Sequence, residues 1–291
     1  MRKVCSWIFV SMLVVVCAGC GRAGDEVPPV ASPSAKFNTT RPPLGSPIEV
    51  SYRWVVEPHA RFDQDYRVMV HFLDSDEELM WTDDHLPPKP TTQWKAGETV
   101  EYTRTMFVPI YPYIGKATVV VGLYSVKTQT RLPLIGEDRG QRSYKVADIQ
   151  LLPQTENVFV IYKDGWHPAE VAEDNPAVDW QWTKKDCVLA FRNPKRDCLL
   201  YLSLDGQPSG LPDPQTLTIS IGGQTLDSFG VGRDQILRRT PITTAQLGTA
   251  DMVELRLQVD KTIVPAALPG AKSRDPRDLG VRVFHAFVEP K

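Results

Sequence analysis

Residues 48–57 read Ile48-Glu49-Val50-Ser51-Tyr52-Arg53-Trp54-Val55-Val56-Glu57, and a large apolar side chain stands at every second position. Positions 49, 51 and 53 between them are charged or polar. Successive side chains of an extended chain point to opposite faces, so this two-residue period predicts a strand with one buried face. The segment is the clearest sign in the sequence of an all-β fold.

Similar segments follow along the first half of the chain, at 66–73, 100–108, 117–126 and 143–152. Segment 117–126 is β-branched and almost wholly apolar, which favours a central strand covered on both faces. No segment shows a convincing helical period of 3.6 residues. Residues 46–153 are therefore predicted to form an antiparallel β-sandwich.

The second half repeats this organisation after a boundary at 153–155. Strands are predicted at 157–162, 185–192, 197–204, 215–221, 224–230, 252–260 and 280–289. Gly222-Gly223 tolerates the positive φ angles of a tight turn and predicts a hairpin, while 243–247 is predicted to form one helical turn. Residues 156–291 are thus expected to be a second β-sandwich, so that the fold is two Ig-like or jelly-roll-like domains.

The composition agrees with two folded domains and excludes several classes of protein. The chain has 291 residues, of which 42% are hydrophobic and 23% charged, an ordinary globular balance. The net charge of -2 argues against a nucleic-acid partner, because no excess of cations is present to contact phosphates. The 25 prolines argue against long helices.

The N-terminus has the features of a targeting segment. A short basic start precedes an apolar run from Val4 to Cys17, which is shorter than the ~20 residues of a membrane span and fits a secretory signal. The run ends in Cys17-Ala18-Gly19-Cys20, which resembles the lipobox of bacterial lipoproteins, although that family usually has Leu where Cys17 stands. The resemblance implies cleavage after residue 19 and a membrane anchor of acyl chains such as palmitate on Cys20.

Residue 21 is Gly rather than Asp, and by resemblance to the enterobacterial sorting rule this favours the outer over the inner membrane. An ordinary signal peptide or an uncleaved anchor is the alternative for residues 1–19. Residues 20–45 are rich in Pro, Ser, Ala, Gly and Thr and are predicted to be a disordered tether between the lipid and the first domain.

Two cysteines, Cys187 and Cys198, remain in the mature domains. If 193–197 were the turn of a hairpin, their strand positions would lie about 16 Å apart, beyond the ~7 Å between Cα atoms that a disulfide spans. Both are therefore predicted to be small core residues. A disulfide stays open, because an envelope location permits one and the strand pairing is assumed.

The two predicted domains contain no HExxH, CxxC, GxSxG or phosphate-loop pattern, and no catalytic residue, metal site or cofactor is predicted. Carboxylates alternate at 74–78, but an EF-hand loop from Asp74 would need Gly and Glu where Leu79 and His85 stand. A solvated hairpin tip is the preferred interpretation. A calcium site there, or a metal bound by His71 and His85, remains an alternative.

Aromatic residues in loops offer a way to bind carbohydrate. Sugar rings present apolar C–H faces that stack on Trp and Tyr, while their hydroxyls bond to polar side chains. The candidate ligand-binding residues are Trp81, Tyr111, Tyr113 and Trp166, with core packing as the alternative for each. Three further tryptophans, Trp54, Trp180 and Trp182, are predicted to fill the cores, the last two on one face of a strand.

Both halves also resemble extracytoplasmic β-sandwich modules found on bacterial membrane glycosyltransferases and on uncharacterised envelope proteins. In the first half the resemblance lies in His71-Phe72-Leu73, His85-Leu86-Pro87, Gln93-Trp94-Lys95-Ala96-Gly97-Glu98 and Val121-Gly122-Leu123-Tyr124. In the second half it lies in Gly165-Trp166-His167-Pro168-Ala169-Glu170, Trp180-Gln181-Trp182-Thr183 and Asp275-Pro276-Arg277-Asp278-Leu279-Gly280-Val281. The resemblance implies a β-sandwich near glycan assembly and no catalytic residues. Asp275 and Arg277 are interpreted as a structural ion pair.

Together these observations predict a non-catalytic lipoprotein of the bacterial cell envelope that binds or helps to handle surface polysaccharide. The alternative is a scaffolding lipoprotein that binds another envelope protein, with exposed sheet edges available for strand addition. An unrecognised hydrolase is a third, minor alternative.

Overall fold

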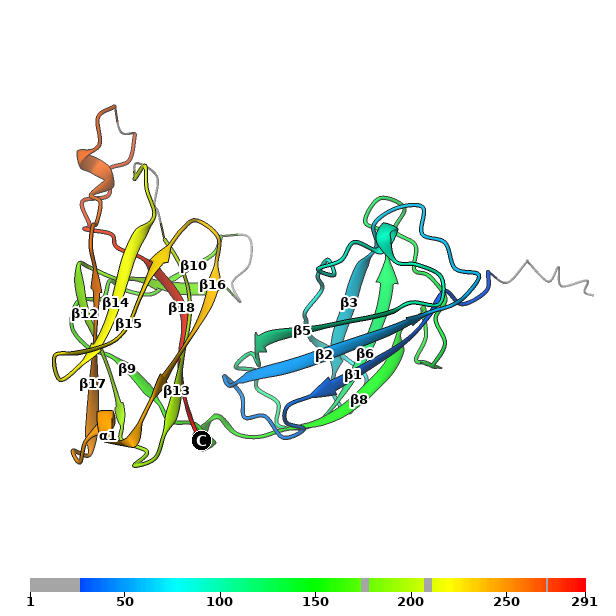
Figure 1. The fold of residues 1–291 in the computed structure, drawn as a ribbon, viewed down its shortest axis with the longest axis horizontal. Coiled ribbons are helices and arrows are strands. Elements are labelled where there is room, and N and C mark those ends of the chain that lie inside the picture. The colour runs from blue at the N-terminus through cyan, green and yellow to red at the C-terminus, as the bar shows by residue number, and fades with distance from the viewer. Residues whose placement is uncertain (1–26, 174–177, 207–210, 271) are drawn as a thin grey trace, which may run out of the picture.

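The computed structural model describes residues 27–173, 178–206, 211–270 and 272–291, and it shows two all-β domains joined by a short connection (Figure 1). The predicted signal peptide and Cys20 lie outside the described residues. Within the described residues, no helix has the length and apolar character needed to cross a membrane.

The first domain packs two antiparallel sheets face to face. The smaller sheet has the order β1 (Ala31–Phe37), β2 (Pro47–Val56), β5 (Thr99–Phe107). The larger has the order β4 (Leu79–Thr82), β3 (Arg67–Leu73), β6 (Gly115–Tyr124), β8 (Tyr144–Leu151), β7 (Glu137–Asp138). Tyr52, Trp54 and Phe72 are buried between the sheets, so the alternation along 48–57 does place its apolar side chains in the core.

The second domain is also a sandwich of two antiparallel sheets. The sheet nearer the first domain in Figure 1 has the order β10 (Glu170–Val171), β11 (Asp179–Trp182), β18 (Arg282–Pro290), β13 (Cys198–Asp205), β16 (Ile236–Ile242). The other has the order β15 (Gln224–Val231), β14 (Gln215–Ile221), β17 (Met252–Val259), β12 (Asp186–Arg192), β9 (Val160–Tyr162). The two-sandwich fold expected from the sequence is confirmed.

Local turn and helix predictions are confirmed as well. Gly222 and Gly223 have φ angles of 54° and 85° and close the β14–β15 hairpin. The single helical turn is α1 (Thr244–Leu247), whose capping box joins the Thr243 and Gln246 side chains to each other's backbone N–H groups. Three short 3-10 turns complete the helical content of the described chain, at Thr91–Gln93, Gln154–Glu156 and Pro265–Ala267.

The predicted tether is wrong over part of its length, because β1 lies within 20–45. This strand pairs with β2 along seven residues, from Ala31 opposite Val56 to Phe37 opposite Val50. It occupies the edge of its sheet, where the missing N–H of Pro33 costs no ladder hydrogen bond. The first domain therefore begins before residue 46.

The assumed hairpin between 185–192 and 197–204 is also wrong. Strand β12 pairs with β17 and β9, whereas β13 pairs with β16 and β18, so the two strands lie in opposite sheets. The core position of the cysteines is confirmed: Cys187 and Cys198 are each 1% exposed, and both are free thiols. Burial raises the pKa of Cys198 to about 11 and that of Cys187 further, so both thiols stay protonated at neutral pH.

Candidate functional site

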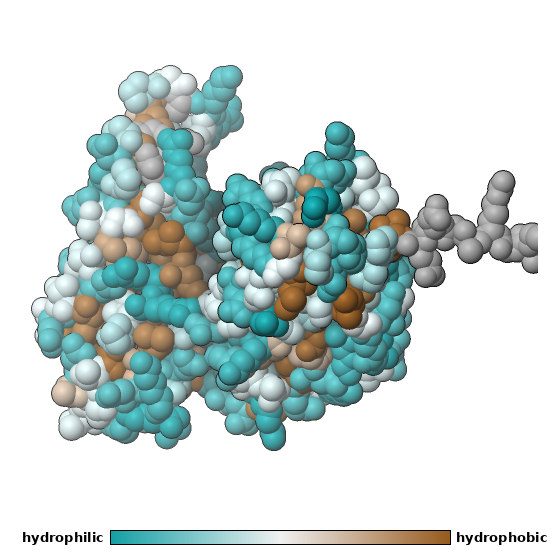
Figure 2. All heavy atoms as spheres, turned by 45° about the vertical axis from the view of Figure 1, so that its right-hand side comes forward, coloured by the Kyte–Doolittle hydropathy of each residue, from teal (hydrophilic) through white to brown (hydrophobic). Residues whose placement is uncertain are grey.

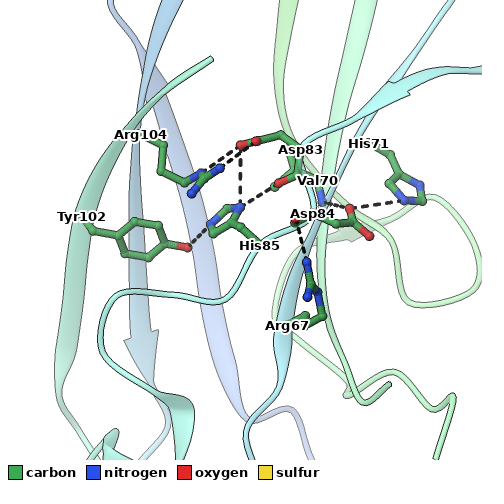
Figure 3. A network of polar contacts seen from close by, with 8 residues as sticks. All are labelled: Arg67, Val70, His71, Asp83, Asp84, His85, Tyr102 and Arg104. Atoms are coloured by element: carbon green, nitrogen blue, oxygen red, sulfur yellow. Dashed lines mark hydrogen bonds and ion pairs between the residues drawn. The ribbon is translucent and has the colours of Figure 1, made fainter. Parts of the chain in front are cut away.

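A polar network inside the first domain connects its two sheets (Figure 3). Asp83, in the loop after β4, accepts two hydrogen bonds from the Arg104 guanidinium of β5, at 3.1 Å and 2.9 Å. His85 lies beside it, with Nδ1 2.7 Å from the Asp83 carbonyl oxygen and Nε2 2.8 Å from Tyr102 Oη. The network thus ties the β4–β5 loop to a strand of the opposite sheet.

The contacts of His85 define its protonation. A carbonyl oxygen only accepts, so Nδ1 carries the proton, and Nε2 of the neutral ring accepts from the Tyr102 hydroxyl. Burial lowers the pKa of His85, which keeps the ring neutral, and burial raises the pKa of Tyr102. His85, Tyr102, Asp83 and Arg104 are hydrogen-bonded to other groups of the protein. The network therefore stabilises the packing of the two sheets and is not proposed as a binding site.

The neighbouring carboxylates and histidines also interact with other groups of the protein. The Asp74 carboxylate accepts the backbone N–H groups of Asp76 and Glu78, which makes 74–78 a capped hairpin tip. His71 Nε2 lies 3.7 Å from Asp84, not beside His85. Among the residues that the structure describes, no three His, Cys, Asp or Glu side chains are placed to hold a metal ion.

The two domains touch through a small number of specific contacts. Arg239 of β16 forms an ion pair with Glu49 of β2 at 2.5 Å and donates a hydrogen bond to Thr105 of β5. The ring of Phe107, at the end of β5, lies 4.6 Å from the ring of His285 on β18. These contacts place the outer face of the β10-β11-β18-β13-β16 sheet opposite the first domain.

A cleft of about 490 Å³ lies at this domain boundary. Its aromatic lining comes from both domains: Phe107, Phe159, Tyr162, Phe284 and Phe287. Its polar lining comes mainly from the second domain and the connection: Gln154, Asn157, Asp179 and His285. Figure 2 shows the two domains as separate lobes with a hollow between them and with hydrophobic residues at the surface of both lobes.

Apolar side chains in the cleft remain open to solvent. Ile110 is 70% exposed and Phe159 is 53% exposed, although both line the cleft. A second hollow, lined by Leu79, Trp81 and Met106, shares Phe107 and Pro109 with the cleft and extends it over the first domain. Exposed apolar surface gathered in a concavity is typical of binding sites.

The wall of the cleft continues onto an aromatic platform on β11 and β18. Arg282 lies over the rings of Trp180, Trp182 and Phe284, at 5.2, 5.5 and 5.4 Å from their centroids. Asp205 on β13 holds this guanidinium with two hydrogen bonds, at 2.8 Å and 2.5 Å. Trp180 and Trp182 do share one face, but it is the outer face, so their predicted place in the core is wrong; Trp54 is buried as predicted.

The four sequence-predicted ligand residues are scattered over the molecule. Trp81 stacks on Phe72 with ring centroids 4.3 Å apart and lines the second hollow. Tyr111 and Tyr113 pack, half-buried, against the core of the first domain, and Tyr113 donates its hydroxyl hydrogen to a backbone carbonyl. Trp166 belongs to the second domain and donates its indole N–H to a backbone carbonyl at 2.9 Å. The structure brings Trp81 near the cleft and leaves the other three outside its lining.

The ion pair of Asp275 and Arg277 is present and is structural. Arg277 donates to both carboxylate oxygens of Asp275 and also contacts Glu170 of β10. The Arg277 guanidinium lowers the pKa of Asp275 to about 2. The pair joins the segment before β18 to the edge strand β10.

A further concavity of about 700 Å³ lies on the outer face of the other sheet of the second domain. Its floor is polar, with Thr218, Ser220 and Gln258 beside Glu254 and Arg256. Glu254 is paired with Lys163, and Arg256 with Asp186. No aromatic side chain lines this concavity among the described residues, so it lacks a stacking surface for a sugar ring.

Sequence reasoning missed the cleft residues Phe107, Phe159, Phe284 and His285. They lie at strand ends or beside the domain boundary, and each fits a strand pattern without distinction. One signal was available: Phe159 stands just before β9, next to the boundary at 153–155, and alternation with Val158 and Val160 leaves its large apolar side chain on the exposed face. Nothing in the sequence paired it with residues more than a hundred positions away.

No family model matches this sequence. No curated protein matches it either. Among solved structures, the chain is similar to the mosquito-larvicidal Cry4Aa toxin from Bacillus thuringiensis, with 7% identity and a TM-score of 0.29 over 90% of this chain. That match spans about half, 52%, of the toxin chain.

Two more structures are similar at the same level. The CBM22-1–CBM22-2 tandem domain of Paenibacillus barcinonensis Xyn10C has 8% identity and a TM-score of 0.28, covering 85% of this chain and 79% of that chain. Salmonella alpha-2-macroglobulin has 12% identity and a TM-score of 0.25, covering 89% of this chain and 15% of that chain. Such TM-scores carry no functional argument, so the function rests on the site itself.

Proposed function

We propose that this protein is a non-catalytic, lipid-anchored envelope protein that binds surface polysaccharide in the cleft between its two domains. One observation carries the proposal: aromatic rings from both domains, and polar side chains from the second domain and the connection, line one cleft of about 490 Å³. Ligand sites are commonly concave, mostly apolar, supplied with a few polar groups, and placed at domain interfaces.

The lining matches the two sides of a sugar's chemistry. The C–H faces of a pyranose are apolar and stack on rings such as Phe159 and Phe284, while its hydroxyls both donate and accept hydrogen bonds. Gln154 offers an amide that both donates and accepts, and Asn157, whose Nδ2 already donates to the Leu44 carbonyl at 2.7 Å, keeps its Oδ1 and one N–H. Stacking rings beside amide groups are the chemistry of reversible sugar binding, which supports a binding role for the cleft.

The binding test is a titration of the chain from residue 21 onward with surface polysaccharide extracted from the source cells. Intrinsic tryptophan fluorescence is the readout, because Trp180 lies 6.1 Å from Phe284. Phe159→Ala and Phe284→Ala should each weaken binding about tenfold, since an aromatic contact contributes about 0.5–1.5 kcal/mol beyond the area it buries.

Phe229→Ala is the matched control. Phe229 also lies under an arginine, with Arg238 4.7 Å from its centroid, but it belongs to β15 of the other sheet. Its removal should leave the affinity unchanged. Absence of a saturable signal at millimolar sugar units, or an equal loss in the control variant, would refute polysaccharide binding in the cleft.

The proposed anchor is tested separately. A lipidated Cys20 predicts that the protein partitions with membranes and incorporates a labelled fatty acid, and that Cys20→Ser abolishes both. Fractionation of inner and outer membranes then tests the preference that Gly21 indicates. A Cys20→Ser protein that still carries label and stays with membranes would contradict this anchor.

The exposed apolar residues support a second candidate, binding of another envelope protein. Leu79, Ile110 and Phe159 are each about half exposed or more, at 51%, 70% and 53%. Clustered surface of this kind is also found at protein interfaces. Crosslinking in intact cells, with a photoreactive residue at position 110, tests it: a discrete crosslinked protein supports this candidate, and labelled polysaccharide alone rejects it.

A further inference from the structure

The charges around the cleft restrict its ligand more than the shape does. Among the described residues that line the cleft, Asp179 is the one whose side chain is charged at neutral pH. Desolvation by the surrounding protein lowers the pKa of the His285 imidazole, and the opposing effect of Asp179 is smaller. Burial raises the pKa of the Tyr162 hydroxyl, and Asp179 raises it further. Both rings are therefore neutral, and the lining as described has a negative charge without a positive one.

Two arginines beside this surface, Arg282 and Arg239, are already paired with carboxylates. The Arg282 guanidinium, which lies over the rings of the aromatic platform, donates hydrogen bonds to both carboxylate oxygens of the buried Asp205. Arg239 is held by Glu49 and Thr105 across the domain boundary, with its guanidinium over the ring of Tyr201. An acidic ligand would have to share one of these guanidinium groups with the carboxylate that already holds it, and each pair has no net charge to attract the ligand.

One wall of the cleft is aliphatic and cannot be covered by hydroxyl groups. It is formed by Ile110 of the first domain and by Val158 and Val160 at the start of the second. A sugar hydroxyl placed against this wall would lose its hydrogen bonds to water without gaining new ones. A methyl group carried by an acetyl substituent would instead bury apolar surface, at ~25 cal/mol per Å².

We propose, on the basis of the polysaccharide-binding function above, that the cleft selects an uncharged, acetylated glycan and rejects polymers of uronic acids. The aromatic rings hold the sugar face, the amides of Gln154 and Asn157 hold its hydroxyls, and the aliphatic wall holds the acetyl methyl. Asp179 repels a sugar carboxylate. It is the residue that enforces the rejection.

The test uses chemically altered forms of one polymer, so that linkage and sugar stereochemistry stay constant. The source cells' polysaccharide is compared with a form deacetylated by hydrazine, a form re-acetylated with acetic anhydride, and a form whose primary hydroxyls are oxidised to carboxylates. Affinities are measured by calorimetry with the chain from residue 21 onward. Deacetylation and oxidation should each weaken binding at least tenfold, and re-acetylation should restore it.

Asp179→Asn gives the residue-specific readout. It should recover most of the affinity lost on oxidation and change the affinity for the unaltered polymer less than threefold. Asp186→Asn, an exposed carboxylate on the opposite sheet paired with Arg256, should recover nothing. Equal binding of the oxidised and unaltered forms, or of the deacetylated form, refutes this selectivity while leaving polysaccharide binding intact. Failure of every form to bind refutes the binding function itself.

Discussion

At the scale of single residues, Gly165 is held where no other residue fits. Its φ is +81°, and a Cβ there would lie 1.9 Å from the carbonyl oxygen of Asp186 and 2.6 Å from the Cα of Cys187. The close approach lets the segment before Trp166 pack onto β12, where Lys184 N–H donates to the Gly165 carbonyl. Gly165 therefore gives a physical reason for the Gly-Trp pair noted in the sequence.

Gly165→Ala should lower the free energy of unfolding of the second domain by at least about 3 kcal/mol, because backbone atoms must move to admit the methyl. Gly97→Ala is the control, since Gly97 has a similar φ of +76° with nothing within 4 Å of the added Cβ. It should cost only about 1–2 kcal/mol of backbone strain. Urea unfolding measures both, and equal losses would contradict the steric argument.

The buried histidine of the first domain predicts a pH dependence. Burial lowers the pKa of His85 below the ordinary histidine value of 6.5, so that between the two pKa values the unfolded chain binds a proton that the folded chain does not. The free energy of unfolding should therefore fall as the pH drops below about 6.5. Denaturant titrations at pH 8 and pH 5 measure this fall.

His85→Gln removes one of the titrating groups and should make that pH profile less steep, with burial of His71 accounting for part of the remaining slope. His59→Gln is the matched control, because His59 is an exposed histidine with one hydrogen bond to a backbone carbonyl. It should leave the profile of the wild type unchanged. A profile that stays equally steep without His85 would show that another group controls the acid sensitivity.

At the scale of elements, the edge strand β1 completes the first sandwich. Val30, Ala31 and Phe37 are buried against the core, and backbone hydrogen bonds join this segment to Glu49 of β2 and to Ile135 in the loop between β6 and β7. The strand is thus a structural part of the domain, although its prolines and serines give it the composition of a linker.

A chain that begins at Ser46 should therefore be less stable than one that begins at Val27. Loss of the buried Phe37 and Val30 side chains alone costs at least about 3 kcal/mol, and the freed edge of β2 exposes unpaired backbone groups. Thermal unfolding should show a lower midpoint for the first domain and an unchanged one for the second. Identical midpoints would mean that residues 27–45 contribute nothing to the fold.

At the scale of the whole molecule, Arg239 fixes how the two domains face each other. It reaches from β16 to Glu49 and Thr105 on two strands of the first domain. Arg239→Ala should widen the distribution of interdomain distances and raise the radius of gyration in small-angle scattering, while each domain keeps its midpoint of thermal unfolding.

Arg256→Ala is the control for that experiment, because Arg256 forms an ion pair with Asp186 on the sheet that faces away from the first domain. It should leave the scattering curve unchanged. An unaltered curve in Arg239→Ala would show that the ring contact of Phe107 with His285 suffices to hold the domains.

The sequence by itself determined most of the strands and, where apolar and polar side chains alternate strictly, which face is buried. The alternation along 48–57 and 252–260 is a local property, since burial of one sheet face selects apolar side chains at every second position. The Gly222-Gly223 turn and the helical turn at α1 are local as well, because positive φ angles and a capping box depend on residues that are neighbours in the chain. The strands that were missed, such as β1 and β16, lie at sheet edges, where Pro33 and Pro241 are tolerated and interrupt the pattern.

Only the tertiary structure decided which strands are neighbours and what lies between the domains. A period of two says that Cys187 and Cys198 are buried but not that their strands lie in opposite sheets, because both arrangements bury the same face. It also says that Trp180 and Trp182 share a face without saying which one. The cleft joins Phe107, Phe159 and Phe284, which lie far apart in the chain, and packing of two separate cores against each other is what brings them together.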